Sequence, residues 1–247
     1  MRTHRTILSF VGILSLLGFF SIYSACGSLE SILDTPGTHT YTSDKRDGLN
    51  TFLVHIPKAY TATKFLPLVF FGHPNGGSAS KEMNQWKQRA ESFPFIAVTM
   101  DLHSSRHSKY LENDKSFLKD VVRRVTGELD HDANWVVYTA HSGGGYAGWH
   151  RIATDHDKIF TALCFRSANC YPPYLDLSRS RWRNRPIYVF WSDNDAPRTS
   201  EQNPQAIDYL KNELKAKRLK YEIIPNGGHA SHPEKFIAWL QEVITSP

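Results

Sequence analysis

The 247-residue chain has little cysteine, and its cysteines and histidines show no spacing typical of a zinc site. It also has no internal repeat and no low-complexity tract. Apolar residues make up 40%, charged residues 21% and aromatic residues 13% of the chain. This composition excludes a disordered chain, a coiled coil and a collagen-like polymer.

A strong excess of either charge is also missing. The 29 lysines and arginines face 24 acidic residues, which gives a formal net charge of +5. The chain has neither the basic stripe nor the motif typical of a nucleic-acid-binding protein, so we expect no nucleic-acid partner. The length fits one medium domain that can bury a sizeable core.

One long apolar run is present, at residues 7–22, and it follows Arg2 and Arg5. The run is short for a membrane-spanning helix, and small residues lead from it to Cys26, so we predict a secretory signal over 1–26. The ending resembles a bacterial lipoprotein signal, in which Cys26 becomes the lipidated first residue. Cleavage nearby without lipid and an uncleaved anchor are the alternatives. We expect an exported protein, membrane contact only through a lipid anchor, a spacer over 27–37 and one domain over 38–247.

Short apolar runs alternate with segments of helix-forming composition over the rest of the chain. Runs that are apolar on both faces are typical of parallel strands buried between helices. The predicted fold class is therefore α/β, a doubly wound, mostly parallel sheet with helices on both faces and an opening hairpin. Residues 167–185 lack a clear pattern and are too few for a large cap domain. Predicted strands cover 51–57, 67–71, 95–100, 135–140, 160–165, 186–191 and 221–224, and predicted helices cover 81–91, 116–126, 144–155, 204–218 and 233–244.

The strongest local motif is Thr-Ala-His-Ser-Gly-Gly-Gly at 139–145, where a predicted strand meets a predicted helix. Small residues two positions before and after Ser142 allow a tight turn with strand and helix close together. That turn exposes the serine hydroxyl at the end of the strand. We therefore predict Ser142 as a nucleophile.

A serine hydroxyl needs a base that a third group aligns. His229 follows the last predicted strand on a glycine-rich turn, and an Asp-Asn-Asp segment at 193–195 follows the strand before it. We predict a triad of Ser142, Asp195 and His229, with Asp193 as the alternative acid. His141 precedes the serine, so its side chain is expected to pack away from the nucleophile.

The attacked carbonyl becomes an oxyanion and needs fixed hydrogen-bond donors. The backbone N–H of Gly143, directly after the serine, is the first candidate. The second should come from the loop at 72–77, after the predicted strand 67–71. Pro74 has no N–H, so Asn75 is the predicted donor, with Gly76 as the alternative. Such a triad requires no metal or organic cofactor.

These motifs resemble those of the α/β-hydrolase superfamily, and within it the secreted esterases similar to polyhydroxybutyrate depolymerases and feruloyl esterases. The resemblance rests on Asp47-Gly48 before the strand 51–57, on the loop 73–77, on the elbow 141–144 and on the histidine loop 226–229. It covers residues 38–243. It implies a serine esterase acting on a small-molecule or polymeric ester through an acyl-enzyme.

Other readings stay open. A catalytically inactive hydrolase fold used as an envelope binding protein is one, and a peptidase or acyltransferase on the same scaffold is another. Cys164 and Cys170 form either a disulfide or two separate thiols. Four aromatic residues line a site or pack in the core: Trp149, Tyr171, Tyr174 and Trp182.

Overall fold

The structure is a computed structural model and describes residues 31–46, 48, 50–61, 63–177 and 181–245. Among these residues, eight strands form one sheet in the order β1-β2-β4-β3-β5-β6-β7-β8. β2 pairs antiparallel with β1 and with β4, and the other neighbouring strands are parallel. The strands are β1 (Gly37–Thr42), β2 (Thr51–Ile56), β3 (Leu68–Gly72), β4 (Ile96–Met100), β5 (Val136–Ser142), β6 (Ala162–Ala168), β7 (Ile187–Ser192) and β8 (Leu219–Ile224).

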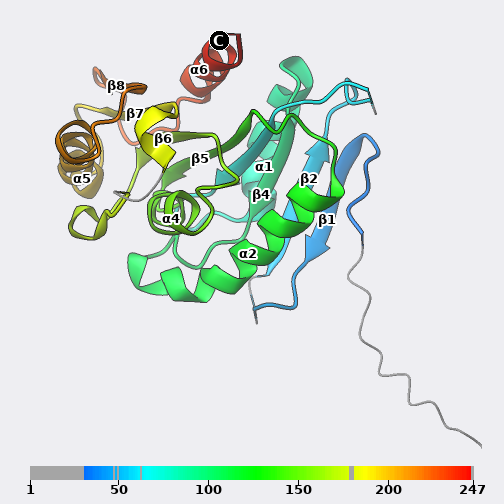
Figure 1. Cartoon of the computed structure of the whole chain (residues 1–247). Helices are drawn as coiled ribbons and strands as arrows, with labels where there is room; N and C mark the ends of the chain where they lie inside the picture. Colours follow the sequence, from blue (N-terminus) through cyan, green and yellow to red (C-terminus); the bar gives the residue numbers. More distant parts are fainter. Residues whose placement is uncertain (1–30, 47, 49, 62, 178–180, 246–247) are drawn as a thin grey trace, which may run out of the picture.

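Helices cover both faces of this sheet, and α2 lies across one of them (Figure 1). Residues of α2, η2, α4 and α5 pack on one face, and residues of α1 and α6 pack on the other. The helices are α1 (Ala79–Ser92), η1 (Ser108–Tyr110), α2 (Leu111–Glu128), α3 (Gly145–Ala147), η2 (Gly148–Ile152), α4 (Ala153–Asp155), η3 (Pro172–Tyr174), η4 (Arg181–Asn184), α5 (Pro197–Asp208), η5 (Tyr209–Glu213) and α6 (Pro233–Thr245).

The central strands are apolar on both faces because each face has a core of its own. In β3, Phe70 belongs to the core under α2, whereas Phe71 belongs to the core under α1 and α6. Successive side chains of a strand point to opposite faces, so a continuous apolar run fills both cores. The prediction of a doubly wound α/β sheet is confirmed.

Several element bounds differ from the predictions. The first strand of the opening hairpin, β1, had no predicted bounds; its residues are mostly polar, and Tyr41 is its one buried residue. The predicted helix 204–218 was wrong at both ends, because α5 begins at Pro197 and contains Pro204, η5 ends at Glu213, and β8 begins at Leu219. β6 extends past the predicted end at 165, and α2 begins before the predicted start at 116. A proline fits the first turn of a helix without loss, and the exposed Pro204 is tolerated within it.

The segment between β6 and β7 contains two short helical turns, η3 and η4, in its described part. This agrees with the prediction of no large cap domain. The loops after β3, β4, β5, β6, β7 and β8 therefore meet at one open edge of the sheet, because parallel strands end at the same edge. This edge holds the predicted functional residues.

The predicted signal, Cys26 and Asp47 lie outside the described residues. The described part of the predicted spacer packs on the domain: Ile32 is buried, and its N–H donates to Glu128 Oε2 at 2.8 Å. In the described part of the chain, no helix is both long and apolar enough to span a bilayer.

Candidate active site

Ser142 occupies a strained turn at the end of β5. Its φ is 51°, in the left-handed region that a residue with a side chain rarely adopts. Neighbouring loops hold this turn by close backbone packing. A Cβ on Gly143 would overlap the carbonyl oxygen of Ser105, and a Cβ on Gly145 would overlap that of Asn169. The glycines are required here by space, and the turn presents the hydroxyl at the edge of the sheet.

The structure brings Ser142, His229 and Asp195 together, although they come from three separate loops. The Ser142 Oγ lies 2.8 Å from His229 Nε2, and His229 Nδ1 lies 2.5 Å from Asp195 Oδ1. A carboxylate accepts, so Nδ1 carries the proton and Nε2 accepts from the serine hydroxyl. This arrangement allows the imidazole to take a proton from the hydroxyl.

Asp195 is buried and is held as a carboxylate by hydrogen bonds. Burial raises the pKa of Asp195, but the bond from His229 and the N–H groups of Ser192 and Ala196 outweigh it, so the pKa is lowered from 3.8. These two N–H groups lie 3.2 and 2.7 Å from the carboxylate. An ionised Asp195 stabilises the positive charge that His229 gains when it accepts a proton.

The alternative acid, Asp193, has another contact. Its carboxylate accepts from the N–H of Asn226 at 2.8 Å, and the Asn194 side chain accepts from the N–H of Gly228 at 2.7 Å. Asn226 and Gly228 both have positive φ, at 52° and 63°. The segment after β7 therefore holds the histidine loop by three side chains, those of residues 193, 194 and 195.

His141 does not pack away from the nucleophile as expected. Its ring lies 5.0 Å from that of His229, measured between ring centroids. Burial, Arg166 and His229 lower the pKa of His141 to about 3. The expectation considered only the position of His141 before the serine and not the ring of His229, which the histidine loop brings to it. A neutral His141 supports the face of His229 without adding a charge.

The two predicted oxyanion donors lie beside the serine. Gly143 follows it directly, and Asn75 lines the same cavity as Ser142 and His229. Neither backbone N–H donates to another described residue. The turn at 74–77 is closed by a 2.9 Å bond from the N–H of Gly77 to the carbonyl of Pro74, and Gly76 has a φ of 73°. Such a turn needs glycine at its third position.

His73 fixes the beginning of this loop. Its buried Nε2 accepts from the N–H of Leu102 at 2.9 Å, so the proton is on Nδ1, which donates to the carbonyl of Pro74 at 2.8 Å. Pro74 has no N–H, but its carbonyl oxygen accepts from His73 Nδ1 and from the N–H of Gly77. This carbonyl shares a peptide plane with the N–H of Asn75, so the two hydrogen bonds orient that N–H.

A cavity of about 360 Å³ opens onto Ser142 and His229. Ala196 and Pro197 supply aliphatic side chains to its lining, and the remaining lining residues are polar or aromatic. They are Asn75, Ser105, Arg106, Ser142, Tyr146, Asn169, Arg198, Thr199 and His229. The side chain of His229 is 33% exposed, so a substrate reaches the triad from solvent.

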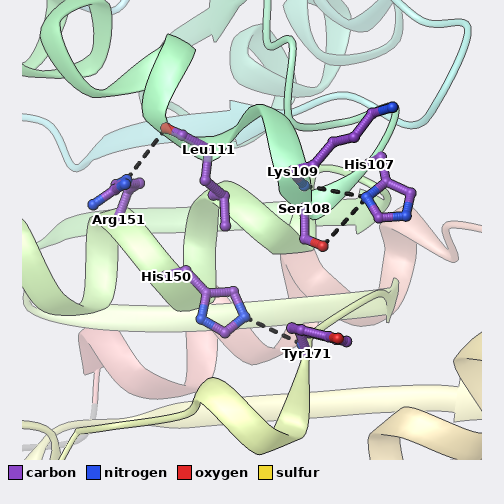
Figure 2. A pocket seen from close by; sticks show the side chains of 7 residues that line it. All are labelled: His107, Ser108, Lys109, Leu111, His150, Arg151 and Tyr171. Carbon is purple, nitrogen blue, oxygen red and sulfur yellow. Dashed lines mark hydrogen bonds between the residues drawn. The ribbon is translucent and has the colours of Figure 1, made fainter.

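A second cavity of about 540 Å³ is lined by His107, by residues of η1, the start of α2 and η2, and by Tyr171 (Figure 2). His107 of this cavity stacks on Tyr146 of the first, with ring centroids 6.5 Å apart. Of the four aromatic candidates, Tyr171 lines this second cavity, whereas Trp149 and Trp182 are fully buried in the core. The side chain of Tyr174 lies outside the described residues.

Cys164 and Cys170 are two separate, buried, free thiols. This resolves the alternative that the sequence left open. Cys164 lies within β6, whose side chains are buried on both faces.

Solved structures of similar fold place this chain in a known fold class. A thermostable esterase superposes with a TM-score of 0.65 at 19% identity over 83% of this chain and 62% of its own. The fluorophosphonate-binding serine hydrolase F of Staphylococcus aureus gives 0.62 at 15% identity, over 86% and 100%. An S-formylglutathione hydrolase of the same species gives 0.59 at 16%, over 86% and 98%.

The protein therefore has the α/β-hydrolase fold, as the resemblance of its motifs implied. At these identities the comparison establishes the fold and leaves the reaction to the site itself. No known protein-family model and no curated protein sequence matches the chain.

Several residues of this site were not predicted from the sequence. Arg106 and Arg198 line the cavity at Ser142, and His141 contacts the imidazole of His229. A signal for Arg198 was present, because it lies close to the predicted Asp195; Arg106 only follows the predicted strand 95–100, which is a weaker signal. The sequence predicted the turn at Ser142 but not the contact of His141 with His229.

Proposed function

We propose that the protein is a serine hydrolase that cleaves carboxylic esters through an acyl-enzyme. The observation that carries this proposal is the chain of two hydrogen bonds from Ser142 through His229 to the buried carboxylate of Asp195. The two unpaired backbone N–H groups beside the serine support it. Esterases and serine hydrolases among the structures of similar fold agree with it.

In the proposed reaction, Ser142 Oγ forms a bond to the ester carbonyl carbon while His229 Nε2 takes the hydroxyl proton. The N–H groups of Gly143 and Asn75 hold the oxyanion. His229 then gives the proton to the leaving alkoxide, and an acyl-serine ester remains. Water repeats the sequence with His229 as base, which releases the carboxylic acid and restores the serine. Asp195 stays ionised throughout.

Replacement of the nucleophile tests the proposal. We expect Ser142→Ala to lower kcat for short 4-nitrophenyl esters by roughly 10⁴–10⁶-fold, because it removes the group that forms the acyl-enzyme. A fluorophosphonate probe should label the wild type and not the variant. Ser92→Ala, at an exposed position near the end of α1, is the matched control and should keep full activity and labelling. Thermal melting checks that both variants fold.

The outcomes separate the other readings. Equal ester turnover by Ser142→Ala and wild type would disprove the assignment. A wild type that neither reacts with the probe nor turns over esters would favour an inactive binding protein. Faster reaction with amides, or acyl transfer to an added alcohol in preference to water, would favour a peptidase or an acyltransferase, since all three use the same acyl-enzyme.

We also propose that the protein is exported and carries a lipid at Cys26. The support is the basic start, the apolar run at 7–22 and the small residues before Cys26. In a bacterial host, the full chain should incorporate a labelled fatty acid and sediment with membranes, and Cys26→Ala should do neither. Cleavage without label would favour a secreted, unlipidated protein.

A further inference from the structure

The cavity at Ser142 has a one-sided charge. No aspartate or glutamate is among its lining residues, whereas Arg106 and Arg198 both are. Arg106 comes from the loop after β4, and Arg198 lies in the first turn of α5, directly after Pro197. The two cations therefore reach the serine from separate loops at the carboxyl edge of the sheet.

Neither arginine is neutralised by an acidic side chain. The ion pairs between described residues include neither of them, and the side chain of Arg198 donates a 3.4 Å bond to the hydroxyl of Tyr146. Some other arginines do pair with acids. Arg166 pairs with Glu82 at 3.2 Å, and Arg151 pairs with Glu112 and Asp155. Both cavity arginines are exposed, so a ligand reaches them.

The positive charge continues into the second cavity (Figure 2). Its lining also has no acidic residue and includes Lys109, with His107 and His150. The ring of His107, which lines the second cavity, stacks on that of Tyr146, which lines the first. Arg151 lines the second cavity as well, but its charge is balanced by its two acidic partners.

The two arginines of this lining suit one kind of group on a substrate. A guanidinium presents paired donors that match a carboxylate or another oxyanion. Cationic clefts also raise the local concentration of anionic substrates. We infer that the preferred substrate is an ester that also carries a separate, negatively charged group, a carboxylate above all. Arg106 and Arg198 bind this group while Ser142 attacks the ester carbonyl. This inference rests on the proposed function.

Two esters of equal length test it: mono(4-nitrophenyl) adipate, which carries a free carboxylate, and 4-nitrophenyl hexanoate, which does not. The measured quantity is the ratio of kcat/KM for the first to kcat/KM for the second, corrected for spontaneous hydrolysis. We expect the wild-type ratio to be about tenfold or more in favour of the anionic ester, and to fall as NaCl is raised, because salt screens exposed charges.

Variants of the arginines assign the preference to these side chains. Arg106→Gln and Arg198→Gln should each lower the ratio roughly tenfold, the order expected for one charge-assisted contact. Arg106→Lys and Arg198→Lys keep the charge and should keep most of the preference. The matched control is Arg218→Gln, at an exposed arginine just before β8 and therefore at the opposite edge of the sheet. It should leave the ratio unchanged.

A wild-type ratio near one would overturn the inference, and so would glutamine variants that behave like Arg218→Gln. An equal fall in Arg218→Gln would also overturn it, because the effect would then belong to the net charge of the protein. If Ser142→Ala abolishes turnover of both esters while the ratio is near one, the proposed function stands and this inference alone fails. If Ser142→Ala turns over both esters normally, the proposed function fails.

Discussion

The elbow at Ser142 and the loop at His229 each place one partner of a hydrogen bond, but different contacts hold the two segments in position. The elbow is fixed by backbone packed against backbone, with glycines at 143 and 145 that leave no room for a Cβ beside Ser105 and Asn169. The histidine loop is largely exposed. It is fixed by the side chains of residues 193, 194 and 195, which bond its amides and its imidazole.

This difference indicates what each region tolerates. The elbow depends on close backbone packing at residues 143 and 145, so one added methyl group should displace it. The histidine loop depends on hydrogen-bond acceptors, so a substitution that removes a charge but keeps the acceptor should preserve its position. Variants of the two regions should therefore fail for different reasons.

Among variants that test how the two regions are held, the largest effect is expected from Gly143→Ala. The added Cβ overlaps the Ser105 carbonyl, so the N–H that we assign to the oxyanion must move. We expect kcat/KM for esters to fall by ~10²–10³-fold, the loss typical of one oxyanion donor. The control is Gly127→Ala in α2, where a Cβ meets nothing within 4 Å. Near wild-type kinetics in Gly143→Ala would refute steric fixing of the elbow.

His141 links the two regions and gives the next effect, on stability. Its pKa is about 3 in the folded protein and 6.5 in the unfolded reference. The unfolded chain therefore binds the proton first, and the stability that neutral His141 contributes is complete above pH 6.5 and is lost as the pH falls towards 3. The slope for one such group is about 1.4 kcal/mol per pH unit.

Urea unfolding of wild type and His141→Gln at pH 7, 6, 5 and 4 measures this slope. The free energy of unfolding of the variant should fall less steeply with acid, since glutamine does not titrate. Other buried histidines contribute equally to both proteins, so the difference between the two curves reports His141. Parallel curves would contradict its burial against His229.

The smallest effect is expected in the histidine loop. Asp193→Ala removes the acceptor for the N–H of Asn226 and should lower kcat about fivefold, because one hydrogen bond contributes roughly 1 kcal/mol. Asp193→Asn keeps a carbonyl acceptor and should retain most of the activity. Steady-state kinetics of both variants check this. A loss in Asp193→Asn as large as in Asp193→Ala would show that charge, and not the hydrogen bond, holds the loop.

Much of this fold could be predicted from the sequence, because buried parallel strands are continuous apolar runs and the catalytic candidates follow their ends. Phe70 and Phe71 are neighbouring residues of such a run, and they fill opposite cores. β1 was harder, since its exposed polar residues carry no such signal. The start of α5 was missed because two prolines, Pro197 and Pro204, compete as the first residue of one helix.

The order of the triad residues along the chain was predictable from the sequence, but their contacts with other residues of the site were not. Spacing past the strand end favoured Asp195 over Asp193, and the geometry has Asp195 against His229. The contact of His141 with His229 joins residues of two segments that are far apart in the sequence. The charge of the cavity depends on Arg106 and Arg198 meeting from two loops, and a sequence read along the chain does not show which loops meet.

The two free thiols have a practical consequence. Cys164 and Cys170 have no exposed surface, and burial raises the pKa of both, that of Cys164 to about 12. Neither is a thiolate near neutral pH, so neither is reactive toward oxidants or alkylating agents in the native state. The described domain thus contains no disulfide that a reducing agent could break.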